Sequence, residues 1–198
     1  MRERDWWLRA ALVLWAPRDV FGAMRGSDPD QRQEPALALI VLTGFFAVLS
    51  TPYFATLLDE PEVDGLSVAV FAFLGAGAYA LVGFFLLGAA LKLGSGAPAR
   101  LARHVVAYAA APLALAVLVL WPLRLSAYGG DLFRRGGADG GVDGTVFTLA
   151  ELGFGLWSLG LLVVGARYAL RLSWAHAAAA CVLPATLVGL AVWIDRFQ

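Results

Sequence analysis

The chain has 198 residues, of which 60% are hydrophobic and only 15% are charged, with a net charge of zero and a mean hydropathy of +0.73. A soluble domain carries roughly 45–50% apolar and about 25% charged residues, so this composition excludes an ordinary soluble fold. A neutral chain offers no basic surface for nucleic acid, and a single cysteine, Cys181, excludes an intramolecular disulfide. We therefore expect an integral membrane protein whose helices lie in the lipid bilayer.

Residues 1–34 are predicted to form a cytoplasmic arm. The apolar run from Ala10 to Ala16 is too short to cross a bilayer, which needs about 20 apolar residues. With the exception of Arg4, which falls on the apolar side, charged and apolar residues around this run lie on opposite sides of a helix, as is typical of an amphipathic helix at the membrane interface. The polar side consists of Arg2, Asp5 and Arg9, and the apolar side of Trp7, Leu8, Ala11, Leu14 and Trp15. Pro17 is expected to end this helix.

Residues 35–198 are predicted to form an all-α transmembrane domain of five helices. Five stretches of this region are almost free of charge and are long enough to cross the bilayer. The predicted spans lie near residues 35–58, 66–92, 105–124, 145–167 and 173–194. Pro52 is expected to kink the far end of the first span.

The distribution of basic residues predicts the orientation of the chain. If the N-terminus is cytoplasmic, eleven of the 15 Lys and Arg residues lie on the inner side. We therefore expect a cytoplasmic N-terminus and a C-terminus outside. The basic residues are almost all arginine, and alanine and glycine are abundant, which indicates a bacterial protein of the plasma membrane.

Glu151, in the fourth predicted span, is the leading candidate for a function inside the membrane. A carboxylate within a span is costly and usually faces a partner or an aqueous cavity. One interpretation is a proton or cation site. The other is an ion pair with Arg124, which is predicted at the outer end of the third span. These two interpretations stay open at the level of the sequence.

Two histidines and one serine are candidates for a metal, pH-sensing or catalytic site. His104 and His176 are both predicted at inner ends of spans, where they would form a metal or pH-sensing site only with further ligands. Ser95, in a Gly-Ser-Gly loop, and His104 are the residue types of a serine protease, but a flexible loop provides no oxyanion hole. Interfacial histidines and an ordinary loop serine are the simpler interpretations, and we expect no catalytic residue, metal or cofactor.

Several segments resemble the Yip (Ypt-interacting protein) domain family. The resemblance lies in the run from Arg103 to Leu113, which contains His104, Tyr108 and Pro112, and in a later span with Trp157. The resemblance implies five clustered spans and a cytoplasmic N-terminus. Eukaryotic members act in membrane traffic and bind Rab-type GTPases, often through a long N-terminal region, whereas the arm here is short.

Two functional hypotheses follow from these features. The first is a non-enzymatic protein of the Yip type that binds a membrane or peripheral protein through its arm. The alternative is a small transporter or channel component that uses Glu151. Ala72, Ala76 and Ala80 form a stripe that serves close helix packing, either within the chain or between copies in a homo-oligomer.

Overall fold

The computed structural model describes residues 6–24, 33–51, 53–60, 63–134 and 142–195, and within these ranges it contains helices but no β-strand. The predicted all-α class is thus confirmed for this part of the chain. In chain order the α-helices and the short 3-10 helices, labelled η, are α1 Trp6–Trp15, α2 Pro17–Ala23, α3 Gln33–Leu49, η3 Phe54–Asp59, α4 Gly65–Ser95, α5 Ala99–Ala109, α6 Ala111–Tyr128, η4 Gly129–Phe133, α7 Val142–Ala169 and α8 Trp174–Asp195.

Four helical stretches among the described residues are long and apolar enough to cross a bilayer. These stretches are Gly65–Ser95, Ala99–Phe133, Gly144–Ala169 and Trp174–Ile194. Three of them agree to within three residues at each end with the spans predicted near 66–92, 145–167 and 173–194, whereas Ala99–Phe133 begins six residues before and ends nine residues after the span predicted near 105–124. Four of the five predicted spans therefore correspond to helices that can span the membrane.

The first predicted span, 35–58, does not form one long helix. Helix α3 ends at Leu49 and the short η3 follows after a break. Pro52, which was expected to kink this span, lies outside the described residues. The apolar part of α3, Ala36–Leu49, is shorter than the roughly 20 residues that a transmembrane helix needs. The fifth crossing therefore stays a prediction.

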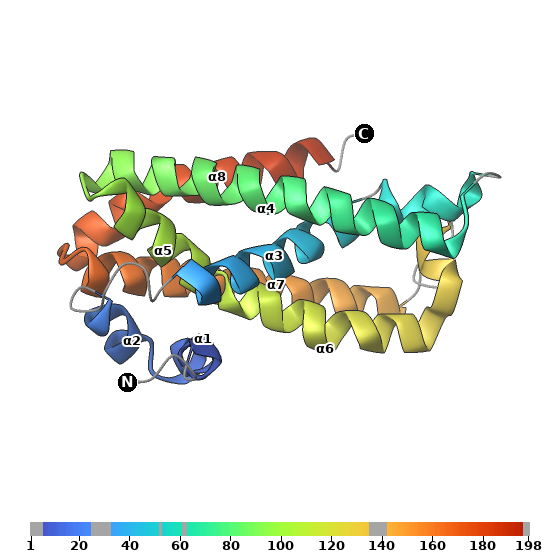
Figure 1. Ribbon diagram of the computed structural model, residues 1–198, viewed down its shortest axis with the longest axis horizontal. Coiled ribbons are helices and arrows are strands. Elements are labelled where there is room, and N and C mark those ends of the chain that lie inside the picture. Colours follow the sequence, from blue (N-terminus) through green and yellow to red (C-terminus); the bar gives the residue numbers. More distant parts are fainter. Residues whose placement is uncertain (1–5, 25–32, 52, 61–62, 135–141, 196–198) are drawn as a thin grey trace.

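The long helices form two layers with two shorter helices between them (Figure 1). Helices α4 and α8 run side by side in one layer, and α6 and α7 form the other. Helices α3 and α5 run obliquely between the layers and contact both of them. The ion pair described below joins the two helices of the second layer.

Small residues let α3 and α4 approach closely. A Cβ atom added at Gly44 of α3 would collide with the carbonyl oxygen of Ala76 and lie 3.0 Å from the Cβ of Ala80. Ala72, Ala76 and Ala80 are all buried. The alanine stripe of α4 therefore packs against α3 of the same chain, as small residues do between membrane helices.

Helix α1 runs across the long axis of the bundle and is viewed close to end-on in Figure 1. Val13 is fully buried against the bundle, whereas Leu8 and Leu12 are exposed and Trp15 is 85% exposed. The described side chains of α1 are therefore apolar on both faces. The predicted polar side, formed by residues 2, 5 and 9, lies outside the described side chains, so the amphipathic division stays a prediction.

Helix α2 is anchored on α7 by one aromatic side chain. Phe21 is fully buried, and a Cβ atom added at Gly165 would lie 2.9 Å from its Cε1 atom. The Cβ atom added at Gly165 would also lie 2.7 Å from Cγ1 of Val105. Glycine at position 165 thus provides the space into which Phe21 packs, and α2 is held against the bundle.

Candidate functional site

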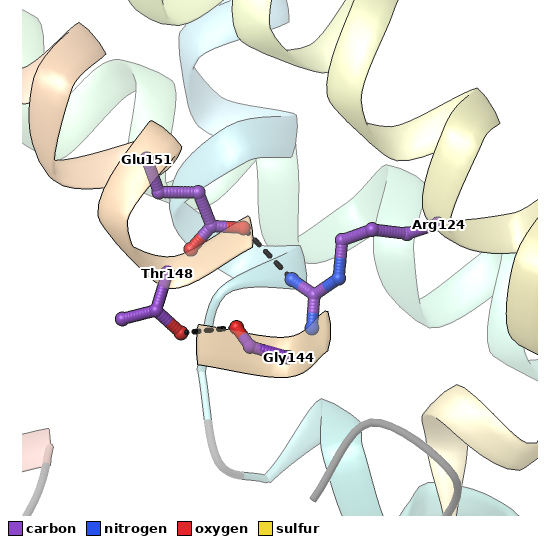
Figure 2. Close-up of polar contacts among 4 residues, drawn as sticks. All are labelled: Arg124, Gly144, Thr148 and Glu151. Atoms are coloured by element: carbon purple, nitrogen blue, oxygen red, sulfur yellow. Dashed lines mark hydrogen bonds and ion pairs between the residues drawn. The ribbon is translucent and has the colours of Figure 1, made fainter. Parts of the chain in front are cut away.

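An ion pair joins the two helices of the second layer. Nη1 of Arg124, in α6, donates a hydrogen bond to Oε1 of Glu151, in α7, at 2.7 Å (Figure 2). The two side chains are 14% and 17% exposed. The structure thus brings Glu151, predicted within the fourth span, together with Arg124, predicted at the end of the third, which is the ion-pair interpretation of the two left open by the sequence.

Aromatic rings surround the guanidinium group of Arg124 in this pair. The guanidinium carbon of Arg124 lies 4.8 Å from the ring centroid of Trp121 and 5.8 Å from that of Phe147. Tyr128 packs edge-on against Phe147, with centroids 5.9 Å apart. The rings attract the cation through their negative faces, and the Arg124 side chain is only 14% exposed.

The position of Glu151 explains why it needs a cation beside it. It lies nine residues, or about 14 Å, along α7 from Val142, where the helix begins. An unpaired carboxylate at such a place in a membrane helix is strongly unfavourable. The hydroxyl of Thr148, one turn before Glu151, donates to the carbonyl oxygen of Gly144 in its own helix, as Figure 2 shows. Chemically, the pair can fix α6 against α7 while keeping both charges compensated.

A second polar feature is the break between α5 and α6. Helix α5 ends at Ala109, and Pro112 lies in the first turn of α6, where a proline lacks the N–H that would continue the earlier helix. Ser158 of α7 donates its hydroxyl hydrogen to the carbonyl oxygen of Ala109 at 2.8 Å. Thr43 of α3 lies 3.4 Å from the carbonyl oxygen of Ala110. The Thr43 hydroxyl donates to the carbonyl oxygen of Leu39 at 2.8 Å, and the carbonyl oxygen of Ala110 accepts the N–H groups of Leu113 and Ala114, so Ser158 is the side chain that supplies a donor at the break.

The sequence analysis did not single out Thr43 or Ser158. Each is a hydroxyl residue within an otherwise apolar stretch, which is the signal that marks such a role. Membrane helices interrupted by proline are commonly repaired by Ser or Thr side chains of neighbouring helices. A search for hydroxyl residues within spans would have found both, but it would not have told which carbonyl they meet.

The residues that resemble the Yip family fall into two groups. His104, Tyr108 and Pro112 are buried and follow one another at helical spacing along α5 and the start of α6. Nδ1 of His104 lies 2.7 Å from the carbonyl oxygen of Arg100, one turn earlier. Trp157 lies apart from this group on α7, where it is 38% exposed and stacks on Phe154 with centroids 6.1 Å apart.

The other candidates of the sequence analysis act within their own helices. Nδ1 of His176, an exposed residue, lies 2.9 Å from the hydroxyl of Ser173, and that hydroxyl also accepts the backbone N–H of His176 at the start of α8. Ser95 donates to the carbonyl oxygen of Leu91 and accepts the N–H of Ala97, so it closes the end of α4. Within the described ranges, the structure places no three His, Cys, Asp or Glu residues where they could hold a metal ion.

Comparison with known proteins gives one result. No curated protein and no solved structure matches the chain. The family model of the Yip1 domain matches residues 11–194, a range that includes α2, all four long apolar stretches, the ion pair and the α5–α6 break. The chain therefore belongs to the Yip1 domain family.

Proposed function

We propose that the chain is a non-enzymatic membrane protein of the Yip type that acts by binding other membrane or peripheral proteins, or by organising the membrane. The match to the Yip1 domain over residues 11–194 carries this proposal, because the role implied by the family resemblance is interaction. In the same proposal the bundle lies in a bacterial plasma membrane, with the N-terminus in the cytoplasm and the C-terminus outside.

The proposal includes α3 as the fifth span. Ala36, Leu39, Ile40 and Val48 are buried along its whole length, and it contacts both α4 and α6. A helix that is enclosed by longer neighbours exposes little of its own length to lipid. A short apolar stretch is therefore tolerated here better than it would be on the outside of the bundle.

The arm is the proposed docking surface for the partner protein. Phe21 and Gly165 hold α2 in place, and Asp19, Gly22 and Ala23 are exposed on it. A surface that is already ordered loses little conformational entropy when a partner binds, which favours affinity. The arm thus offers a small, preformed, solvent-facing element at one end of the bundle.

The Arg124–Glu151 pair supports a packing role for Glu151 within this proposal. Its carboxylate already accepts a charge-assisted hydrogen bond at 2.7 Å, and the pair is mostly buried. Transport through a carboxylate requires that it exchange this partner for a proton or cation. The transporter alternative has no further observation in its favour, so we retain the interaction proposal.

The test is affinity capture of the full chain from native membranes, with the wild-type protein compared with Asp19→Arg. Glu60→Arg is the matched control, because Glu60 is also an exposed acid but follows η3 at the other end of the bundle. We expect a reproducible set of partner proteins that Asp19→Arg loses and Glu60→Arg retains. Absence of any reproducible partner of the wild type, or equal capture by both variants, would contradict the proposal.

A further inference from the structure

Two arginines converge on one tyrosine at the end of the bundle where α7 ends and α8 begins. The guanidinium carbon of Arg18, in α2, lies 5.8 Å from the ring centroid of Tyr168, and that of Arg167 lies 5.6 Å from the same centroid. Arg167 also lies 5.9 Å from the ring of Trp174, which packs edge-on against Tyr168. We call Arg18, Arg167, Tyr168 and Trp174 the arginine–tyrosine cluster.

The fold brings this cluster together through the arm. Phe21 packs at Gly165, and Arg18 reaches Tyr168, so residues three apart on α2 meet residues three apart on α7. The two helices therefore run antiparallel along this contact. The Phe21 anchor thereby fixes the position of Arg18, which would otherwise sit on an independent short helix.

The cluster carries positive charge that the described residues do not neutralise. No carboxylate of the described chain pairs with Arg18 or Arg167. One guanidinium nitrogen of Arg167, Nη1, donates to the carbonyl oxygen of Leu172 at 2.8 Å, while its buried Nε has no hydrogen-bond partner. Arg124, at the other end of the bundle, has a carboxylate at 2.7 Å. Arg124 is therefore paired with a carboxylate, whereas Arg18 and Arg167 have no carboxylate partner among the described residues.

The cluster also lies at the ends of two helices that are long and apolar enough to cross a bilayer. The apolar stretch of α7 ends at Ala169 and that of α8 begins at Trp174, directly beside the cluster. Tyr168 is half-buried and Trp174 is 50% exposed, so the aromatic rings remain open to the bilayer interface, where such rings concentrate. Arginines at this level meet phosphate groups, and their planar N–H donors match phosphate oxygens.

We infer that the arginine–tyrosine cluster binds the phosphate group of an anionic membrane phospholipid. In this site Arg18 and Arg167 supply the charge, and the rings of Tyr168 and Trp174 hold the two guanidinium groups in place. The same groups would also bind inorganic phosphate. We favour a lipid phosphate because the cluster lies beside the ends of two apolar helices. The site requires only the bilayer and does not depend on the proposed protein partner.

The test measures lipid retention by the purified full chain with native mass spectrometry, comparing phosphatidylglycerol with phosphatidylcholine. We expect preferential retention of phosphatidylglycerol, and Arg18→Gln should weaken it about tenfold through loss of a charge-assisted contact. Lys92→Gln is the matched control, because it removes an exposed charge near the C-terminal end of α4 outside the cluster. Its effect should stay within about twofold.

Substitutions of Tyr168 test whether its aromatic ring is needed to position the two arginines. Tyr168→Phe keeps the ring and should retain phosphatidylglycerol as the wild type does, whereas Tyr168→Leu should weaken it. Equal effects of Arg18→Gln and Lys92→Gln would overturn the site, since they would indicate attraction by net charge alone. Displacement of the lipid by inorganic phosphate as effectively as by short-chain phosphatidylglycerol would overturn the lipid assignment in favour of free phosphate.

Discussion

Removing either partner of the Arg124–Glu151 pair should destabilise the bundle far more than removing both. In Glu151→Leu the guanidinium of Arg124 keeps its charge but loses the oxygen at 2.7 Å. Its side chain is only 14% exposed, so water replaces little of the lost interaction. Breaking one partner of a buried pair costs about 3–5 kcal/mol, and the partial exposure here favours the lower end of that range.

The double variant Arg124→Leu/Glu151→Leu should recover most of this loss. Apolar side chains of roughly similar volume fill the space between α6 and α7 without leaving a buried charge, so we expect stability within about 1 kcal/mol of the wild type. Thr148→Val is the control on the same helix, because the hydroxyl of Thr148 donates to the carbonyl oxygen of Gly144, one turn earlier in its own helix. It should change the free energy of unfolding by less than about 1 kcal/mol.

Equilibrium unfolding in mixed detergent micelles, followed by circular dichroism, gives the four free energies of this double-mutant cycle. Single-variant losses below about 1 kcal/mol, or a double variant no more stable than the worse single variant, would refute the packing role. A flux assay in liposomes addresses the alternative. If Glu151 carries a proton or cation, Glu151→Gln abolishes the flux, whereas the packing role predicts no flux that depends on this residue.

Three further outcomes follow from the packing and the predicted topology. Gly165→Val should release the arm and expose it to proteolysis at a cost of about 1–3 kcal/mol, whereas Gly160→Val on the same helix, where a Cβ meets nothing within 4 Å, should not. Ser158→Ala leaves a carbonyl of the α5–α6 break without its hydroxyl and should lower the free energy of unfolding by about 1–3 kcal/mol, measured in the same micelles. If α3 is a fifth span, residues 19 and 60 lie on opposite sides of the membrane. A membrane-impermeant maleimide applied to intact cells should then label Glu60→Cys but not Asp19→Cys, both in a Cys181→Ser background. Labelling of both or of neither would contradict α3 as a fifth span.

The sequence predicted the long helices well because lipid imposes a simple rule on them. A stretch that lacks charge for about 20 residues has few alternatives to a membrane helix, since its backbone must satisfy its own hydrogen bonds. The same reasoning placed Arg124 and Glu151 near each other, because consecutive antiparallel spans bring the end of one beside the start of the next. Both inferences use only neighbouring parts of the chain.

The features that the sequence did not predict depend on residues far apart in the chain. The span near 105–124 was expected as one helix, although it is part of two that meet at Ala110. Pro112 alone is compatible with the first turn of a helix, so its presence does not locate a break. The break becomes tolerable in an apolar interior because the hydroxyl of Ser158 donates to the carbonyl oxygen of Ala109, and the N–H groups of Leu113 and Ala114 donate to that of Ala110.

The same dependence on distant contacts explains the arm. Nothing local to Phe21 predicts that it packs on Gly165, since a phenylalanine in a short helix fits a membrane interface equally well. Once that contact exists, Arg18 lies at Tyr168 beside Arg167, and neither arginine has a carboxylate partner among the described residues. At the opposite end, Arg124 is compensated by Glu151 and enclosed by rings. A charged ligand therefore gains most from the end that carries the arm, and this end is where both the proposed protein partner and the proposed phospholipid would bind.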